Sequence, residues 1–196
     1  MPSRRVQFAT GEYYHIFNRG VGRGAIYRDD VDYMEFLRRL KQNAGRYDIR
    51  IIAYCLIPNH FHLLVRQDET ASAGTMVQYI SNGYAQWFNR RHQRNGTLFQ
   101  GRFEAIHVDE DGYLRHLCRY IHGNPVRHGI AMQPALWDYS NYRDWVGLRP
   151  GTLVDHQFVI NFFGTAAAYT RYLMDYLTHN RDVPEKLQTY LRGLEE

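Results

Sequence analysis

The sequence predicts an α+β fold, with a ferredoxin-like antiparallel sheet of four strands, helices packed on one face, and a C-terminal helical extension. Three observations lead to this prediction. Up to Pro125 the expected elements follow the order strand, helix, strand, strand, helix, strand, helix, which is the ferredoxin-like plan with one helix added. The second and third strands are separated by the turn residues Pro58 and Asn59 alone, so they should pair antiparallel. The first two helices each carry one apolar stripe, which suits packing on a sheet.

The elements of the first half follow from periodicity and turn residues. Residues 11–19 form the first predicted strand, which the glycine-rich segment 20–24 ends. A helix then starts at Asp29, because acidic residues favour a helix N-terminus and apolar residues recur at helical spacing, namely Tyr33, Phe36, Leu37 and Leu40. Residues 49–56 form the second strand, and the third begins at His60.

The second half continues the pattern. A helix is expected over residues 75–91, with Met76, Ile80, Tyr84, Trp87 and Phe88 on its apolar face. Residues 99–107 form the fourth predicted strand, and a third helix follows Asp109 with the stripe Leu114, Leu117, Cys118 and Ile121. A connector rich in Pro, Trp and Tyr leads to a last helix over residues 165–180. We expect one domain over residues 1–130, with residues 131–196 as an extension packed on it.

Composition places the chain among ordinary globular proteins with a basic balance. Of its 196 residues 44% are hydrophobic and 22% are charged, and the net charge is +4. Cys55 and Cys118 lie in apolar segments, as buried thiols do in a reducing compartment. The sequence has neither a signal-peptide core nor an apolar run long enough to span a bilayer, so we expect a cytoplasmic protein that does not contact membranes. Aromatic residues reach 15%, and mixed basic and aromatic surface is typical of proteins that bind single-stranded nucleic acid.

The third strand carries the most informative motif. Side chains alternate between the two faces of a strand, so His60, His62 and Leu64 share one face while Phe61, Leu63 and Val65 share the other. One face can thus bury a core while the other holds a cation between two imidazoles. A histidine on a half-buried strand is more often a hydrogen-bonded structural residue, and two ligands do not complete a coordination sphere. A third ligand is required.

The third helix offers candidates for that ligand and for a nucleophile. Tyr120 and Asn124 are four residues apart, so they lie on one face of the helix. Tyr120 is displaced by about 100 degrees from Ile121, off the main apolar stripe. A tyrosine at the margin of a helix is ordinarily an amphipathic edge residue, so this position alone is weak evidence of function.

Three motifs in this order resemble one family closely. They are Pro-Asn-His-Phe-His-Leu-Leu from residue 58, Gly-Arg-Phe from residue 101, and Arg-Tyr-Ile-His-Gly-Asn-Pro-Val-Arg from residue 119. The chain resembles the single-tyrosine HUH transposases of insertion sequences, and most of all the REP-associated tyrosine transposases, from about Tyr13 to Trp145. The resemblance implies that residues 1–130 are a catalytic domain. Many insertion-sequence relatives have Gln where this chain has Asn124, so the shorter side chain must bring the helix closer.

The resemblance also implies a mechanism. His60, His62 and Asn124 would hold a divalent metal, and Tyr120 would be the nucleophile of a single-stranded DNA endonuclease and strand transferase. An amide oxygen combined with phosphate and water ligands suits Mg²⁺ or Mn²⁺, which is also the family implication. Attack by Tyr120 would leave a 5′-phosphotyrosine and a free 3′-hydroxyl at or near DNA hairpins of repeat elements. The glycine segment 20–24 lacks the spacing of a phosphate-binding loop, so no nucleotide cofactor is expected.

Basic residues near these motifs are candidate contacts to single-stranded or hairpin DNA. Arg4 and Arg5 lie on an N-terminal arm that could reach a groove, and three more cations crowd the end of the second helix. The candidates are Arg4, Arg5, Arg90, Arg91, Arg94, Arg102, Arg119 and Arg127. Solvated surface cations, and cations that favour a helix C-terminus, are the alternative interpretation.

Two other functions compete with the transposase. One is a regulator that binds DNA hairpins without cutting them, which the intact His60, His62, Tyr120 and Asn124 argue against. The other is a replication initiator or relaxase of the wider HUH group, which usually carries a longer histidine cluster or helicase domains. We expect a monomer, with a dimer that exchanges the tyrosine helix as the alternative.

Overall fold

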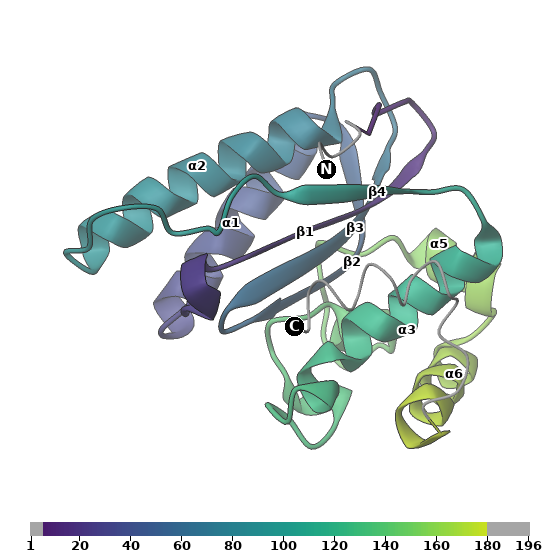
Figure 1. The fold of residues 1–196 in the computed structure, drawn as a ribbon. Coiled ribbons are helices and arrows are strands. Elements are labelled where there is room, and N and C mark those ends of the chain that lie inside the picture. The colour runs from purple at the N-terminus through teal and green to yellow at the C-terminus, as the bar shows by residue number, and fades with distance from the viewer. Residues whose placement is uncertain (1–5, 180–196) are drawn as a thin grey trace.

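The computed structural model describes residues 6–179, and its centre is a four-stranded antiparallel sheet (Figure 1). The strands are β1 (Tyr13–Arg19), β2 (Ile49–Ile57), β3 (His60–Gln67) and β4 (Glu104–Val108), in the order β2-β3-β1-β4. β3 pairs antiparallel with β2 and β1, and β1 pairs antiparallel with β4. This order confirms the predicted ferredoxin-like sheet and places β1 and β3 at its centre.

Helices separate and follow the strands. They are α1 (Asp30–Arg46), α2 (Ala73–Arg91), α3 (Asp111–Arg127), α4 (Tyr142–Trp145), α5 (His156–Phe163) and α6 (Ala166–His179), with short 3₁₀ turns η1 (Val21–Arg23) and η2 (Pro134–Leu136). Local sequence fixes two of the starts. The carboxylate of Asp29 accepts a hydrogen bond from the backbone N–H of Asp32, and Ser72 caps α2 in the same way.

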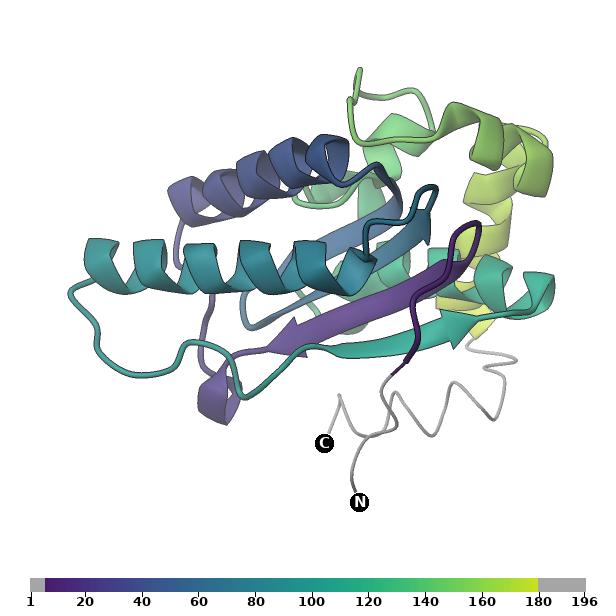
Figure 2. The same ribbon diagram turned by 90° about the horizontal axis from the view of Figure 1, so that it is seen from above.

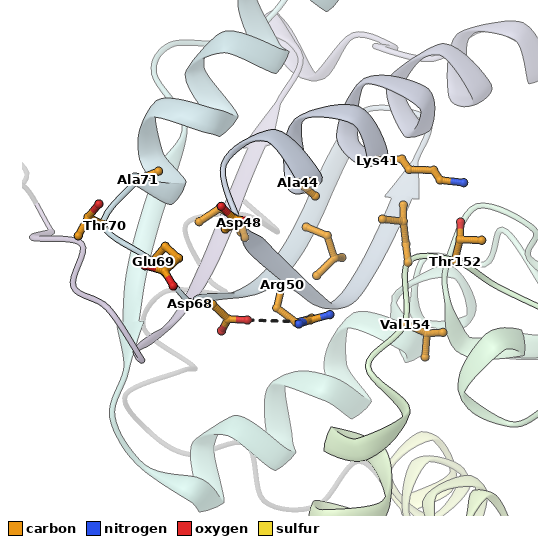
Figure 3. Close-up of a pocket in the computed structure, with 14 residues that line it drawn as sticks. Lys41, Ala44, Asp48, Arg50, Asp68, Glu69, Thr70, Ala71, Thr152 and Val154 are labelled. Carbon is orange, nitrogen blue, oxygen red and sulfur yellow. Dashed lines mark ion pairs between the residues drawn. The ribbon is translucent and has the colours of Figure 1, made fainter.

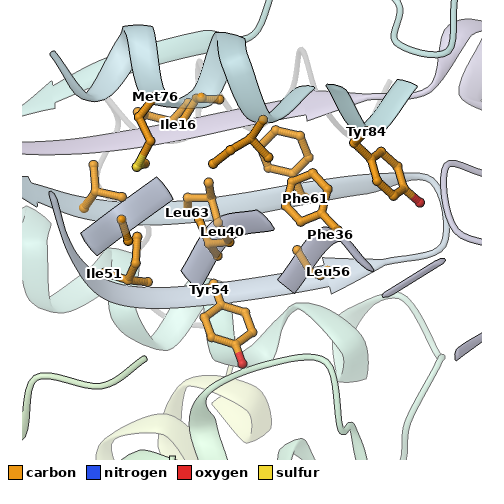
Figure 4. Packing of buried hydrophobic residues seen from close by; sticks show 14 of the residues in the cluster. Ile16, Phe36, Leu40, Ile51, Tyr54, Leu56, Phe61, Leu63, Met76 and Tyr84 are labelled. Carbon is orange, nitrogen blue, oxygen red and sulfur yellow. The ribbon is translucent and has the colours of Figure 1, made fainter. Parts of the chain in front are cut away.

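One face of the sheet is covered by α1 and α2, which lie side by side across it (Figure 2). Their apolar stripes meet the side chains that β1, β2 and β3 direct to this face, as Figure 4 shows for Phe36, Leu40, Phe61 and Leu63. This layer is a closely packed aromatic and aliphatic core. The two helices that connect the strands therefore pack as the sequence predicted.

The opposite face is covered by α3 and the C-terminal helices (Figure 1). The prediction that helices pack on one face therefore holds for α1 and α2 but not for α3. The physical reason is in β2, where eight of nine residues are buried, so both of its faces are apolar and both need cover. Residues facing α3 include Ile52, Cys55 and Leu64.

Residues 139–141 run along the outer edge of β2. The backbone N–H of Leu56 donates to the carbonyl of Tyr139, and the side chain of Asn141 bonds both the N–H of Tyr54 and the carbonyl of Ile52. These bonds pair an edge that would otherwise expose unsatisfied backbone groups.

The C-terminal helix α6 packs closely on α3. A side chain at Gly123 would place its Cβ 3.1 Å from Leu177, so glycine permits this approach. Residues of α4, α5 and α6 share one buried hydrophobic cluster with residues of β2 and α3. Among residues 6–179, no helix is long and apolar enough to cross a membrane.

The fourth strand begins later than predicted. Residues 99–103 make a turn and an isolated bridge between Phe99 and Gly20, and regular pairing starts at Glu104. The backbone pairing of this segment with β1 is interrupted at Asn18, whose side chain donates a hydrogen bond to the carbonyl of Gly101. The loop before β4 is therefore held against the end of β1.

Candidate active site

β3 presents its two histidines to α3. Phe61 and Leu63 belong to the core under α1 and α2, whereas Leu64 belongs to the core under α3, so the alternation expected from the sequence is present. The exposed fraction is 6% for His60 and 0% for His62. Their ring centroids are 5.0 Å apart with the planes nearly perpendicular. Both imidazoles therefore lie in the layer between the sheet and α3.

α3 brings the amide and the phenol to the same place. The Oδ1 atom of Asn124 is 3.2 Å from Nε2 of His60. The ring of Tyr120 meets the ring of His62 edge-on, at a centroid distance of 5.3 Å. Both α3 residues are buried. His60, His62, Asn124 and Tyr120, which are separated by up to 64 positions in sequence, thus converge on one spot.

The polar atoms of this spot suit a bound cation. His60 Nδ1 lies 2.9 Å from Oδ1 of Asn59, so a proton on Nδ1 leaves the Nε2 lone pair facing Asn124 Oδ1. Two lone pairs that face each other repel unless a cation lies between them. Among the described residues, the buried atoms His62 Nε2 and Asn124 Nδ2 have no hydrogen-bond partner. Buried polar atoms rarely lack a hydrogen-bond partner in native proteins, and a functional site is one explanation where they do.

Both imidazoles are neutral near pH 7. Burial, with a smaller contribution from the nearby His128, lowers the pKa of His60 to about 3. Burial also holds the pKa of His62 well below its ordinary value, with His60 as the next cause. A histidine must be deprotonated to bind a metal, so the surroundings favour the metal-binding form.

Within residues 6–179, no three side chains of His, Cys, Asp or Glu are grouped as metal ligands. A metal at this spot would therefore depend on the amide of Asn124 as its third protein ligand. The role of Asn124 as a metal ligand, expected from the sequence, stays a prediction.

Comparison with known proteins decides the family. The model of the IS200-like transposases matches residues 9–124, which include both histidines, Tyr120 and Asn124. The chain belongs to the IS200-like transposase family. The fold class, the antiparallel sheet and the family expected from the sequence motifs are thus confirmed.

Two proteins similar to this transposase are described as REP-associated tyrosine transposases. A Haemophilus influenzae protein described as a REP-associated tyrosine transposase is 28% identical over 123 residues, which are 57% of this chain and 70% of the relative. A solved structure of a REP-associated tyrosine transposase bound to a REP hairpin has a TM-score of 0.61 and 20% identity, and covers 79% of this chain and 94% of its own. The chain is thus a DNA-processing enzyme of the transposase kind.

Three residues of this transposase lie at the site although the sequence did not fix a role for them. His15 of β1 bonds His62, His128 lies after α3 with its ring 5.1 Å from that of His60, and Arg19 is the pairing partner of His60 in the sheet. Strand alternation places His15 on the same face as Phe17, which the sequence shows. Only the register of β1 against β3 shows that His15 lies beside His62.

The predicted DNA-contacting arginines are placed in different surroundings. Arg102 is exposed and lines an open pocket of about 230 Å³ together with Asn18 and Arg19, at the end of β1 nearest His60. Arg90 is exposed on α2. Arg127 lies over the ring of Tyr120, 5.5 Å from its centroid, and donates to the hydroxyl of Tyr176. Arg102 and Arg127 remain candidates beside the site, whereas Arg90 lies on α2, which covers the opposite face of the sheet (Figure 2).

Other predicted arginines serve the fold. Arg119 has an exposed fraction of 9% and lies over the rings of Tyr172 and Tyr176 in α6. Arg91 pairs with the carboxylates of Asp29 and buried Asp32. Arg94 bonds Asn89 and the carbonyl of Thr97, which shapes the loop after α2. Arg4 and Arg5 lie outside the described residues.

An open pocket of about 760 Å³ lies at the opposite end of β2 and β3 (Figure 3). It is lined by charges of both signs, with Arg50 paired to Asp68 at 3.4 Å. His60 starts β3 and Asp68 follows its end, so this pocket is separated from the histidines by the length of a strand. It takes no part in the candidate site.

Proposed function

We propose that this transposase is a metal-dependent endonuclease and strand transferase for single-stranded DNA beside hairpins, with Tyr120 as its nucleophile. The observation that carries the proposal is the convergence of His60, His62, Asn124 and Tyr120 in one buried spot of a single chain. Membership in the IS200-like family and a fold shared with a protein solved on a REP hairpin support the choice of substrate.

The donor set fits Mg²⁺ or Mn²⁺. His60 Nε2, His62 Nε2 and Asn124 Oδ1 would hold the ion and leave coordination positions for phosphate oxygens and water. When bound, such an ion neutralises charge on a scissile phosphate and orients it for in-line attack. The chain's own contribution is to fix three ligands between the sheet and α3.

Tyr120 is suited to attack by its position on α3. Its ring contacts the ring of His62 edge-on and the guanidinium of Arg127. In the reaction its Oη atom forms a bond to phosphorus, its proton leaves to a base, and the bond from phosphorus to the 3′ oxygen breaks. That oxygen takes up a proton and becomes a 3′-hydroxyl. A phenol with a pKa near 10 needs such a polarised target to react at neutral pH.

The covalent product accounts for strand transfer. A 5′-phosphotyrosine replaces the broken phosphoester bond with a new one to Tyr120, so a DNA 3′-hydroxyl can attack the phosphorus and release Tyr120 without ATP. Hydrolysis would end the cycle, and burial of the site protects against it. Because both histidines, the amide and the phenol come from one chain, a monomer suffices for the reaction.

DNA should approach along the end of the sheet where β3 starts. In Figures 1 and 2 the end of β1, the turn between β2 and β3, and the C-terminal end of α2 lie at the same end of the molecule. Arg19 and Arg102 line the open pocket there. Cations beside an open pocket provide the phosphate contacts that single-stranded DNA requires.

The test uses the full chain and an end-labelled hairpin with single-stranded flanks taken from its genomic neighbourhood, with Mn²⁺. We expect a covalent adduct on a denaturing gel. Tyr120→Phe should retain hairpin binding and lose cleavage below detection, since removal of a catalytic nucleophile costs about a million-fold elsewhere. Tyr113→Phe is the matched control, because Tyr113 is a buried tyrosine two turns earlier on α3 and should still cut. Cleavage by Tyr120→Phe would refute the nucleophile, and hairpin binding without any cleavage by the unaltered chain would indicate the non-cleaving regulator.

A further inference from the structure

His15 lies beside His62 in the centre of the sheet. In the pairing of β1 with β3, His15 is opposite Leu64 and Phe17 is opposite His62. His15 and His62 are therefore diagonal neighbours on the face that α3 covers. Both rings have an exposed fraction of 0%. The position is fixed by two central strands and is closed to solvent.

The two rings meet edge to edge through their nitrogens. His15 Nε2 is 3.0 Å from His62 Nδ1. The ring planes differ by 22°, and the centroids are 5.2 Å apart, much farther than the two nitrogens. This is the geometry of an in-plane hydrogen bond between imidazoles, not of face-to-face stacking.

The direction of this bond determines what His62 can do. If His15 donates, the proton of neutral His62 lies on Nε2, and that nitrogen has no lone pair for a metal. If His62 donates from Nδ1, its Nε2 lone pair is available, and His15 is the acceptor. Only the second arrangement is compatible with His62 as a ligand.

His60 shows the same arrangement at the other ligand. Its Nδ1 lies 2.9 Å from Oδ1 of Asn59, which leaves its Nε2 toward Asn124. Each candidate imidazole is thus held at Nδ1 by a neighbour. The difference is that Asn59 is half-buried in a turn, whereas His15 is enclosed in the core.

We propose that His15 is a positioning residue that accepts the Nδ1 proton of His62 and so directs the Nε2 lone pair of His62 to the cation. This inference rests on the proposed metal-dependent function. Groups that orient a metal-bound histidine in this way typically change metal affinity by 10- to 100-fold when removed. In this arrangement the proton of His15 lies on Nδ1, an atom with no hydrogen-bond partner among the described residues.

The test measures Mn²⁺ binding by electron paramagnetic resonance and, separately, the tautomers of ¹⁵N-histidine-labelled protein with Mg²⁺ by NMR. His15→Phe keeps a buried ring but removes the acceptor, and should weaken Mn²⁺ binding at least about 10-fold. His15→Gln carries an amide oxygen near the position of Nε2 and should regain most of the affinity. His107→Phe is the matched control, since His107 lies on neighbouring β4 and pairs with Glu12. The unaltered protein should show the His62 proton on Nδ1.

The outcomes separate this inference from the function on which it rests. Unchanged Mn²⁺ affinity in His15→Phe would overturn the inference and leave the metal site standing. A His62 proton on Nε2 with Mg²⁺ present would overturn both the inference and the assignment of His62 as a ligand. Failure of the unaltered protein to bind Mn²⁺ would overturn the metal site and the inference together. Circular dichroism of each variant shows whether a loss of affinity reflects unfolding.

Discussion

The two faces of the central sheet are built from the same strands but differ in chemistry. Under α1 and α2 the strands place Ile16, Phe61 and Leu63, which pack with aromatic and aliphatic partners. Under α3 the alternate positions hold His15, His60 and His62, all buried, and His15 Nδ1 and His62 Nε2 lack hydrogen-bond partners among the described residues. The strands thus direct apolar side chains to one face and histidines with unsatisfied polar atoms to the other.

The difference separates stability from function along a single strand. Buried polar atoms without partners cost about 1–3 kcal/mol each, so a face selected for stability alone would not keep them. Phe61 and His62 are adjacent in sequence, yet their environments lie on opposite sides of the sheet. At one position of β3 a substitution should therefore reduce cleavage more than stability, and at the next position it should reduce stability more than cleavage.

The largest effect is expected on the histidine face. His60→Ala removes one candidate ligand, and metal assistance supplies several kcal/mol to such reactions, so cleavage of the hairpin should fall at least about 1000-fold. Mn²⁺ binding should weaken in parallel, whereas the melting temperature should change less than in Phe61→Ala. Cleavage rates, Mn²⁺ titration and thermal melts measure the three effects. His107→Ala is the control, and loss of cleavage with full Mn²⁺ affinity would contradict the ligand role.

The adjacent residue should show the reverse. Phe61 is fully buried, with ring centroids 5.1 Å from Phe36 and 6.1 Å from Phe99. Phe61→Ala should lower the free energy of unfolding by about 3–5 kcal/mol and the melting temperature by about 10 °C. Cleavage per folded molecule should change little. Met34→Ala, at an exposed position of α1, is the control and should be nearly neutral. A cleavage defect in Phe61→Ala that exceeds its loss of folded protein would break the separation of the two faces.

Sequence reasoning located the parts of both faces but not their assembly. Alternation in β3 and the spacing of Tyr120 and Asn124 are local properties, so periodicity revealed them. Which face α3 covers depends on β2, whose continuous apolar run shows burial on both faces only when it is paired in the sheet. The contact of His15 with His62 depends on the register of β1 against β3, which no local pattern encodes.

The predicted DNA-contacting arginines also depend on tertiary contacts that local sequence does not encode. Charge and sequence neighbours made all of these arginines equal candidates for DNA contact, but Arg91 pairs with Asp32 and Arg119 lies over rings of α6. Arg102 is exposed beside the site. Tertiary partners decide whether a cation is available for DNA, and composition cannot show them.

Lowering the pH should reduce the folding stability contributed by the buried, neutral histidines under α3. Burial lowers the pKa of His15 and of His60 to about 3, below the ordinary value near 6.5 in the unfolded chain. The unfolded chain therefore binds protons first, so this stability is fully present above about pH 6.5 and is lost as the pH falls toward 3. Between pH 6.5 and pH 5 each such histidine should cost about 2 kcal/mol.

Urea unfolding without divalent metal at pH 7.0, 6.0 and 5.0 measures this loss, in a range above the ordinary titration of carboxylates. Phe61→Ala should be less stable than the unaltered protein by the same amount at each pH, because its cost involves no protons. Equal stability of the unaltered protein at pH 7 and pH 5 would show that the histidines are not buried as neutral groups.

The smallest effect concerns two arginines at the end of the molecule where β3 starts. Arg102 is exposed by the pocket near His60, so Arg102→Ala should remove one phosphate contact. The slope of log affinity against log salt should fall by about 1, and hairpin affinity near 0.15 M salt should drop roughly fourfold. Arg91→Ala is the matched control, since its guanidinium is held by Asp29 and Asp32, 2.9 and 2.6 Å away.

Removing Arg91 leaves the buried carboxylate of Asp32 with fewer partners, so Arg91→Ala should lower stability by about 1–3 kcal/mol and leave the salt slope unchanged. Fluorescence anisotropy of a labelled hairpin across salt concentrations, together with thermal melts, measures both quantities. If Arg91→Ala changes the salt slope and Arg102→Ala does not, DNA lies along α2 and not at the end of β1. The division between residues that serve the fold and residues that serve the substrate would then have to be redrawn for this end of the molecule, because the ion pairs of Arg91 would open when DNA binds.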